Sequence, residues 1–219
     1  MTPAALIARA DALLVDLDGT LVDSTAPVRR TWSAFASRHG LDPEHVFRFA
    51  QGRPSRETIR LLAPQADQEL EAATVEDAEV SDTDGVSALP GASALLACHR
   101  QLAIVTSCSG RLARARLRAA DLPTPRVLVS SDGLKQGKPD PACFLIAARR
   151  LGTAPERCVV LEDAPAGIRA GRAAGATVIA LRTTHPDEEL REAHAIADNL
   201  ASLTTTPDTP TPTKVQTLT

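Results

Sequence analysis

The hydrophobic positions of this chain form two patterns, short continuous apolar runs and longer stretches with helical spacing. Apolar runs of four or five residues that end in turn residues are typical of strands buried on both faces of a sheet. We expect five such strands, at residues 12–16, 102–106, 127–130, 158–162 and 177–181. Helical stretches of about ten residues lie between them, at residues 111–120, 141–151 and 165–174. This alternation is typical of parallel strands joined by right-handed helical crossovers.

The segment between the first two strands has helical spacing and no apolar run of the strand type. Trp32, Phe35 and Ala36 share one helical face, which ends at Gly40. Three more helices, the last of them acidic, are expected up to residue 80. The sequence therefore predicts an α/β fold, in which a small helical cap interrupts a doubly wound, Rossmann-like parallel sheet after its first strand.

The same patterns predict the domain boundaries. We expect the sheet domain to comprise residues 1–24 and 90–203, and the helical cap to comprise residues 25–89. A cap inserted there would lie over the end of the first strand, as a lid does. Residues 204–219 are rich in Thr and Pro and are expected to form a disordered tail, because they cannot build a core. An inert extension is favoured over a docking motif for this tail.

Composition narrows the possible classes of protein. Hydrophobic residues make up 43% of the chain and charged residues 23%, a balance typical of soluble globular proteins. The net charge of −3, without a dense cluster of Lys and Arg, argues against nucleic acid as the main partner. No apolar run is long enough to cross a bilayer, and the N-terminus lacks the pattern of a secretion signal.

The cysteines and histidines show no pattern of a disulfide framework or a zinc site. Cys98, Cys108, Cys143 and Cys158 are widely spaced and form no Cys-x-x-Cys pair, which fits a reduced compartment. The five histidines lack the spacing of zinc ligands. We therefore expect a cytoplasmic protein. With the charge and the short apolar runs described above, we expect it to bind neither nucleic acid nor membranes. We also expect it to be a monomer or weak dimer.

Candidate chemistry begins at the end of the first strand, where Asp16 and Asp18 follow the apolar run. Residues two apart on a strand point to the same side, and ligands bind at the carboxyl ends of the strands in such sheets. Two close carboxylates repel each other unless a cation or a proton lies between them, and Mg²⁺ prefers oxygen ligands. One carboxylate can then attack an electrophile while the other moves a proton. Taken alone, the pair also fits a strand that ends in acidic surface residues.

Three further loops carry polar residues that belong with this pair. Thr106 precedes backbone amides that can hold an anion, Lys138 lies in a Gly/Pro loop, and Glu162 and Asp163 end another strand. Each feature alone also has a structural explanation, such as a helix cap or a solvated lysine. Together they point to one site, because two acidic strand ends can share a metal while a hydroxyl and an ammonium bind a phosphoryl group.

In this order, these residues closely resemble the motifs of the haloacid dehalogenase-like hydrolase superfamily. The resemblance covers about residues 12–203 and rests on the Asp-x-Asp-Gly-Thr run of residues 16–20, Thr106, Lys138, Glu162 and Asp163. The chain further resembles the subgroup with a helical cap after the first motif. That subgroup contains sugar and polyol phosphatases, phosphoglycolate phosphatases and β-phosphoglucomutase.

The resemblance implies a mechanism and a role for each motif residue. Asp16 would attack phosphorus to form an aspartyl-phosphate, and Asp18 would protonate the leaving alcohol and then activate water. Mg²⁺ would be held by the Asp16 carboxylate, the backbone carbonyl of Asp18 and the Asp163 carboxylate, with Glu162 just behind these ligands. The phosphoryl oxygens would contact two further residues, Thr106 and Lys138. Dehalogenases of the superfamily lack the second aspartate, so Asp18 favours phosphoryl transfer over dehalogenation.

Substrate selection is expected to lie mainly in the cap. A turn at Gly52 and Arg53 presents a guanidinium that can hydrogen-bond two adjacent hydroxyls or a carboxylate. The alternative is that Arg53 only ties cap helices together. Ser107 and Cys108 complete the predicted substrate-binding set, with Cys108 as a small loop residue rather than a nucleophile, because no neighbouring base is evident.

The prediction for function is a magnesium-dependent phosphatase that hydrolyses a small sugar or polyol phosphate. The turn at Gly52 and two later Gly-containing segments, at residues 84–86 and 89–92, resemble sugar-phosphate and glycerol-phosphate phosphatases more than phosphoglycolate phosphatases. A β-phosphoglucomutase-type mutase and a phosphoglycolate phosphatase are the enzymatic alternatives. A regulatory or binding protein on a phosphatase scaffold is the alternative of another class, and it is disfavoured because every motif residue is present.

Overall fold

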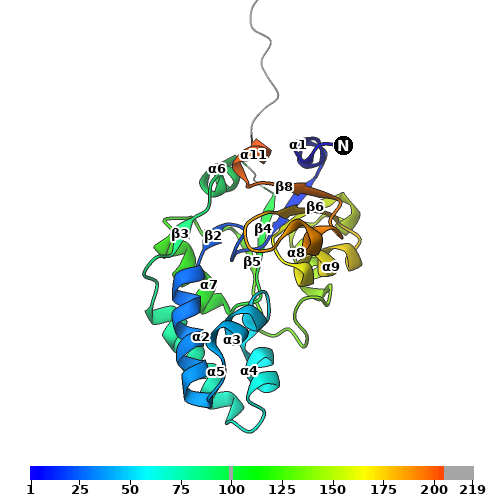
Figure 1. Cartoon of the computed structure of the whole chain (residues 1–219). Helices are drawn as coiled ribbons and strands as arrows, with labels where there is room; N and C mark the ends of the chain where they lie inside the picture. Colours follow the sequence, from blue (N-terminus) through cyan, green and yellow to red (C-terminus); the bar gives the residue numbers. More distant parts are fainter. Residues whose placement is uncertain (99–100, 205–219) are drawn as a thin grey trace, which may run out of the picture.

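A computed structural model describes residues 1–98 and 101–204, and Figure 1 shows a sheet with helices on both faces above a group of helices. Within these residues the main sheet has six parallel strands in the order β5-β4-β1-β6-β7-β8. Their bounds are β1 Ala12–Val15, β4 Leu102–Val105, β5 Val127–Val129, β6 Cys158–Glu162, β7 Thr177–Leu181 and β8 Ala195–Ala197. Val15 lies opposite both Ile104 and Leu161, so β1, β4 and β6 end at the same edge.

Side chains on the two faces of the sheet form two separate cores, because successive residues of a strand point to opposite sides. Leu13 and Val15 of β1 belong to one core, and Ala12 and Leu14 belong to the other. The first core is covered by α6 Ala92–Cys98, α7 Gly110–Ala119 and α11 Ala201–Thr204, with α1 Pro3–Ala8 beside it. The second is covered by α8 Ala142–Leu151, α9 Pro165–Ala173 and α10 Asp187–Leu190. The predicted doubly wound α/β class is confirmed.

The helical insertion has a core of its own. Its helices are α2 Thr25–His39, α3 Pro43–Ala50, α4 Ser55–Leu62 and α5 Gln68–Ser81. Trp32 and Phe35 of α2 pack with Val46, Ile59 and Val75 from the other three helices. Figure 1 shows α2 and α5 running side by side away from the sheet.

The structure corrects the predicted elements at several points. The insertion is not free of strands, because β2 Val22–Asp23 and β3 Ser87–Ala88 pair antiparallel where the chain enters and leaves it. Two-residue strands are too short to leave a periodic pattern in the sequence. The sixth strand, β8, was not predicted either, since its apolar run is only three residues long.

Strand ends and the C-terminus also differ from the prediction. The strands β1, β4 and β5 end one residue early, so Asp16 and Thr106 are the first loop residues after their strands. Thr204 is the last residue of α11 and not part of the predicted tail, because the helix extends to it. The rest of the predicted tail, residues 205–219, lies outside the described residues.

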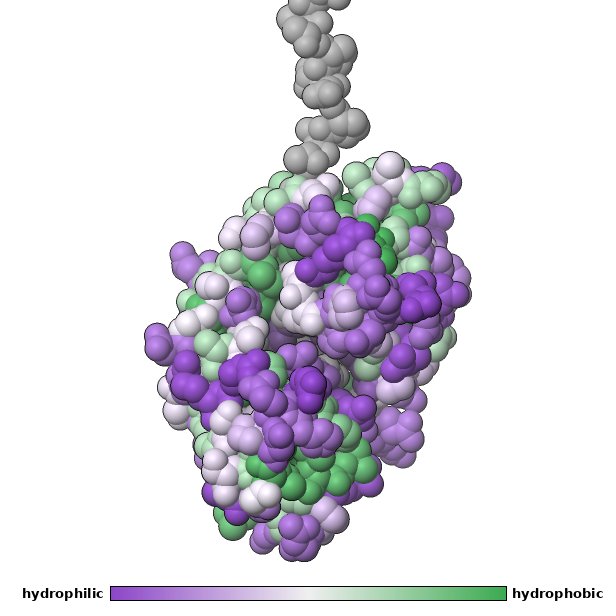
Figure 2. Space-filling model, viewed as in Figure 1, coloured by the Kyte–Doolittle hydropathy of each residue, from purple (hydrophilic) through white to green (hydrophobic). Residues whose placement is uncertain are grey.

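The surface between the two parts is hollowed and carries many hydrophilic residues, as Figure 2 shows. In the described part of the chain, no helix is long and apolar enough to cross a membrane. The cytoplasmic location and the monomeric or weakly dimeric state stay predictions.

Candidate active site

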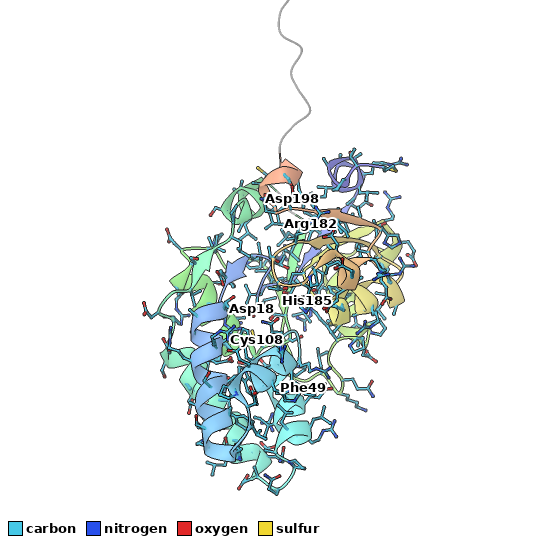
Figure 3. The ribbon with its side chains drawn as sticks, viewed as in Figure 1. Asp18, Phe49, Cys108, Arg182, His185 and Asp198 are labelled. Atoms are coloured by element: carbon cyan, nitrogen blue, oxygen red, sulfur yellow. The ribbon has the colours of Figure 1, made fainter. Side chains whose placement is uncertain are left out.

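A cavity of about 120 Å³ lies between the end of β1 and the helical insertion. From the sheet domain it is lined by Asp16, Asp18, Thr106, Ser107, Cys108, Arg116 and Asp163, among others. From the insertion it is lined by Val28, Trp32, Phe47, Gly52, Arg53 and Glu79, among others. Figure 3 shows Asp18, Cys108 and His185 together in this region, with Phe49 on the side of the insertion.

Lys138 forms a buried ion-pair centre beneath this cavity. Its Nζ donates to Asp16 Oδ1 at 2.5 Å, to Glu162 Oε1 at 2.6 Å and to the carbonyl oxygen of Val105 at 3.0 Å. Burial opposes the charge of Lys138, but the two carboxylates outweigh this effect and raise the pKa of Lys138, so the ammonium stays charged. Burial also raises the pKa of Asp16 well above its usual value; Lys138 opposes the rise, while Glu162 and Asp163 add to it.

Asp163 is buried beside this centre and is held by hydroxyl groups. Thr20 Oγ1 donates to Asp163 Oδ1 at 3.3 Å, and the Thr184 hydroxyl donates to Oδ2. His185 Nδ1 lies 3.1 Å from the Asp163 carbonyl oxygen. Burial, together with a neighbouring carboxylate, raises the pKa of Asp163 to about 7. Gly19 has φ +80°, and a Cβ there would lie 2.2 Å from Asp163 Oδ2, so only glycine lets the chain pass this close.

Carboxylate oxygens of Asp16, Glu162 and Asp163 lie within 4.8 Å of one another, which makes this cluster a candidate metal site. Glu162 Oε1 accepts from Lys138, and its Oε2 accepts from the backbone N–H groups of Asp163 and Ala164 at 3.0 Å each. The carboxylates of Asp16 and Asp163 are therefore the ones we assign to a cation. Three carboxylates against one ammonium leave an excess of negative charge, and an oxygen donor set of this kind suits Mg²⁺.

We expect the metal-free protein to lose thermal stability as the pH rises from about 5 to about 7. The pKa of Asp163 is about 7 in the folded state against 3.8 for the ordinary group, so the folded protein binds more protons in this range. Stability therefore falls as the pH rises from the unfolded pKa towards the folded one. Calorimetry should show a fall in melting temperature on the order of 3–8 °C.

Saturating Mg²⁺ should remove most of that fall, because the cation stabilises the ionised carboxylates. His194, whose pKa is lowered by burial, lies outside the cluster and acts alike in both conditions. The difference between the loaded and metal-free curves therefore isolates the cluster. Equal pH dependence in both would contradict the assignment of a metal to Asp16 and Asp163.

Asp18 is held through both of its carboxylate oxygens. Ser24 Oγ donates to Oδ1 at 2.7 Å, and Arg116 Nη1 donates to Oδ2 at 2.6 Å. Arg116 Nη2 also lies 3.4 Å from Glu79 Oε1, so a chain of ion pairs joins Asp18 to α5 of the insertion. These contacts involve only the side chain of Asp18. The role of its backbone carbonyl as a metal ligand therefore stays a prediction.

Sequence analysis missed Arg116, Glu79, Ser24, Thr20, Thr184 and His185. A signal for Arg116 was present, because it falls one helical turn from Leu112, Ala113 and Ala120, which are buried. An arginine on the buried face of α7 needs a charged partner. No comparable pattern marks the other five; Ser24 pairs with Asp18 six residues away, and Glu79, Thr20, Thr184 and His185 contact residues that are distant in the sequence.

The loop after β4 contacts the insertion. Thr106 Oγ1 accepts from the backbone N–H of Cys108 at 3.2 Å, and Ser107 Oγ donates to the carbonyl oxygen of Gly52 at 3.3 Å. Burial raises the pKa of Cys108 to about 12, so this thiol stays protonated. That agrees with the prediction that Cys108 is not a nucleophile.

Arg53 lies at the rim of the cavity and contacts other residues of the insertion. Its guanidinium lies 4.4 Å from the Phe49 ring centre, and its Nη1 lies 3.6 Å from Glu57 Oε1. These contacts support the alternative in which Arg53 ties cap helices together. Because Arg53 also lines the cavity, its contact with substrate stays a prediction.

Comparison with known proteins gives a family for the chain. Residues 10–175 match the haloacid dehalogenase-like hydrolases. Hexitol phosphatase A of Escherichia coli (strain K12) is 43% identical over 205 residues, covering 90% of this chain and 95% of that protein. Validoxylamine A 7'-phosphate phosphatase of Streptomyces hygroscopicus subsp. limoneus is 34% identical over 200 residues, covering 87% and 94%. The structure of β-phosphoglucomutase from Clostridium difficile superposes with a TM-score of 0.79 over 89% of this chain and 93% of that one; at 21% identity this concerns the fold alone.

Proposed function

The chain belongs to the haloacid dehalogenase-like hydrolase family, and on that premise we propose that it is a magnesium-dependent phosphatase that hydrolyses the phosphate ester of a small sugar or polyol. The observation that carries this proposal is the buried centre of Asp16, Lys138 and Asp163 below a cavity that Asp18 also lines. The relatives named hexitol phosphatase A and validoxylamine A 7'-phosphate phosphatase support the substrate class.

We assign the attack on phosphorus to Asp16. Lys138 holds Oδ1 of this carboxylate, so the other oxygen, Oδ2, forms the bond to phosphorus while the bond to the ester oxygen breaks. The product is an aspartyl-phosphate and an alcohol. Burial raises the pKa of Asp16, and the ion pair with Lys138 opposes that rise, which favours the ionised carboxylate that attacks.

We assign proton transfer to Asp18. It gives a proton to the leaving oxygen in the first step and takes one from water in the second. That water attacks the phosphorus of the aspartyl-phosphate, which releases inorganic phosphate and restores the Asp16 carboxylate. Ser24 and Arg116 hold the two oxygens of Asp18, so its carboxylate keeps a fixed orientation.

The phosphoryl oxygens are assigned to Thr106 and to the backbone N–H groups of the loop that follows it. A cation between Asp16 and Asp163 would supply positive charge to the same oxygens. Residues 25–89 are proposed to act as the cap that covers the substrate. Val28, Trp32 and Phe47 of this segment form an apolar wall, which excludes water from the reacting groups.

The proposal is tested by phosphate release from sugar, polyol and two-carbon acid phosphates, with Mg²⁺ or with EDTA. We expect hydrolysis of sugar or polyol phosphates that falls at least about 100-fold in EDTA and returns with excess Mg²⁺, because the cation offsets several kcal/mol of developing charge. Conversion of a hexose 1-phosphate into the 6-phosphate without phosphate release would indicate a mutase instead. No turnover of any ester with Mg²⁺ would contradict the proposal.

A further inference from the structure

Glu79 is a buried carboxylate that faces the cavity from the insertion. Only 5% of Glu79 is exposed, yet it lines the cavity. Its Oε1 lies 3.4 Å from Arg116 Nη2, and Trp32 lines the same cavity. An ionised carboxylate can accept about four hydrogen bonds, so acceptor positions remain for a molecule in the cavity.

Arg116 places Glu79 on the side of the leaving group. The guanidinium is planar and rigid, with Nη1 on Asp18 and Nη2 near Glu79. The two carboxylates therefore occupy neighbouring positions along the cavity wall. Since Asp18 is assigned to the leaving oxygen and Asp16 to the phosphorus, Glu79 faces the atoms beyond the leaving oxygen.

The chemistry of this wall favours a neutral leaving group with hydroxyls. Hydroxyl groups can donate to Glu79, and the rings of Trp32 and Phe47, which line the same cavity, offer an apolar surface for a carbon chain. A carboxylate in the leaving group would repel the ionised Glu79, or would require Glu79 to be protonated. Arg116 does not offset this repulsion, because its guanidinium already faces the side chains of Asp18 and Glu79.

We propose that Glu79 is a specificity-determining residue that accepts hydrogen bonds from hydroxyls of the leaving group and excludes phosphate esters whose leaving group carries a carboxylate. The inference rests on the proposed function, because it assumes that Asp18 meets the leaving oxygen. It narrows the substrate class to phosphate esters of neutral polyhydroxy alcohols.

Two matched pairs of esters test this proposal. Glycerol 3-phosphate and 3-phosphoglycerate differ by a hydroxymethyl group against a carboxylate, and glucitol 6-phosphate and 6-phosphogluconate differ in the same way on a longer chain. We expect the enzyme to prefer the neutral member of at least one pair by about 100-fold or more in kcat/KM, the size expected when a buried acceptor meets a like charge. Glu79→Gln should reduce this preference at least about 10-fold, chiefly through KM, because the amide neither repels the acid nor accepts as strongly.

Two further variants separate the charge of Glu79 from its shape. Asp77→Asn removes the same charge two residues away in α5, where Asp77 pairs with Arg111 in an exposed contact, and it should leave the preference unchanged. Glu79→Asp keeps the charge and shortens the side chain, so it should still reject the acids but lose about 10-fold in kcat/KM for the neutral esters. Thermal melts establish that each variant is folded.

The outcomes distinguish this proposal from the function on which it rests. If no ester of either kind is hydrolysed with Mg²⁺, the proposed function itself fails. If the neutral esters are hydrolysed but Glu79→Gln keeps the preference of the unmodified enzyme, as Asp77→Asn does, the role of Glu79 is overturned and the function stands. A preference for the acids, or hydrolysis of them by Glu79→Asp, would overturn it too.

Discussion

Replacement of Asp16 by Asn should lower kcat for the preferred phosphate ester by at least about 10⁴-fold, because the amide cannot form the aspartyl-phosphate. The side chain keeps its volume, and Lys138 keeps its contacts with Glu162 and Val105. The cavity should therefore still bind substrate, and the loss should lie in kcat more than in KM. Phosphate release at saturating substrate measures the effect directly.

A matched control and a trapping experiment make this result specific. Asp23→Asn removes a carboxylate from β2, where Asp23 is exposed and accepts from the backbone N–H of Thr25, and should change activity by no more than about twofold. Acid quenching during turnover of a labelled ester should leave phosphate bound to the unmodified chain and none bound to the Asn variant. An Asn variant with more than about 1% of the original kcat would place the nucleophile elsewhere.

Replacement of Lys138 by Met should have the second large effect, and it should appear in stability as well as in activity. The substitution leaves Asp16 and Glu162 buried without their shared cation, with Asp163 close by. Breaking a buried pair in this way costs about 3–5 kcal/mol of the free energy of unfolding. Urea denaturation in EDTA near neutral pH measures this loss, and phosphate release should fall by at least about 100-fold, since one charge at the reacting centre is gone.

The pH dependence of this destabilisation provides a second test. Burial already raises the pKa of Asp16 and Asp163, and loss of Lys138 should raise both further. The variant would then take up protons as the pH falls, so its deficit in stability should be largest near about pH 8 and smaller near about pH 5. Lys135→Met, in the same loop but at an exposed position, is the control and should change neither stability nor its pH dependence. A Lys138 variant as stable as that control at about pH 8 would refute the ion-pair account.

Polar contacts between α5 and α7 give the cap a defined position over the site. Ser109 Oγ donates to Glu76 Oε1 at 2.7 Å, one turn of α5 before Glu79. Arg116 lies on α7, the helix that Ser109 caps, and contacts both Asp18 and Glu79. Asp18, which we propose to act on the leaving oxygen, and Glu79 of the insertion thus contact the same arginine, which links the position of α5 to the orientation of Asp18.

The pattern of apolar and polar residues along the sequence was enough to predict the parallel sheet and the polar residues at the ends of its strands. The runs that became β1, β4 and β6 are apolar throughout because both faces of the sheet are covered, and each run stops at a polar residue. Parallel neighbours end at one edge, so Asp16, Thr106 and Asp163 could be grouped from their positions after three such runs. This pattern did not predict the two-residue strands or the short β8, since runs of two or three residues are too short to show a hydrophobic period.

Which side chains pair with one another was decided only by the tertiary structure. Arg116 lies 98 residues from Asp18 in the sequence, and Lys138 lies 122 residues from Asp16. Helical spacing shows that Arg116 faces inward, but it does not show which element brings the opposite charge, because that partner is set by how helices pack across the sheet and the cap. Glu79 is the clearest case: in the sequence it is one of several acids in an acidic helix, and only the packing of α5 on α7 makes it a buried carboxylate that faces the cavity.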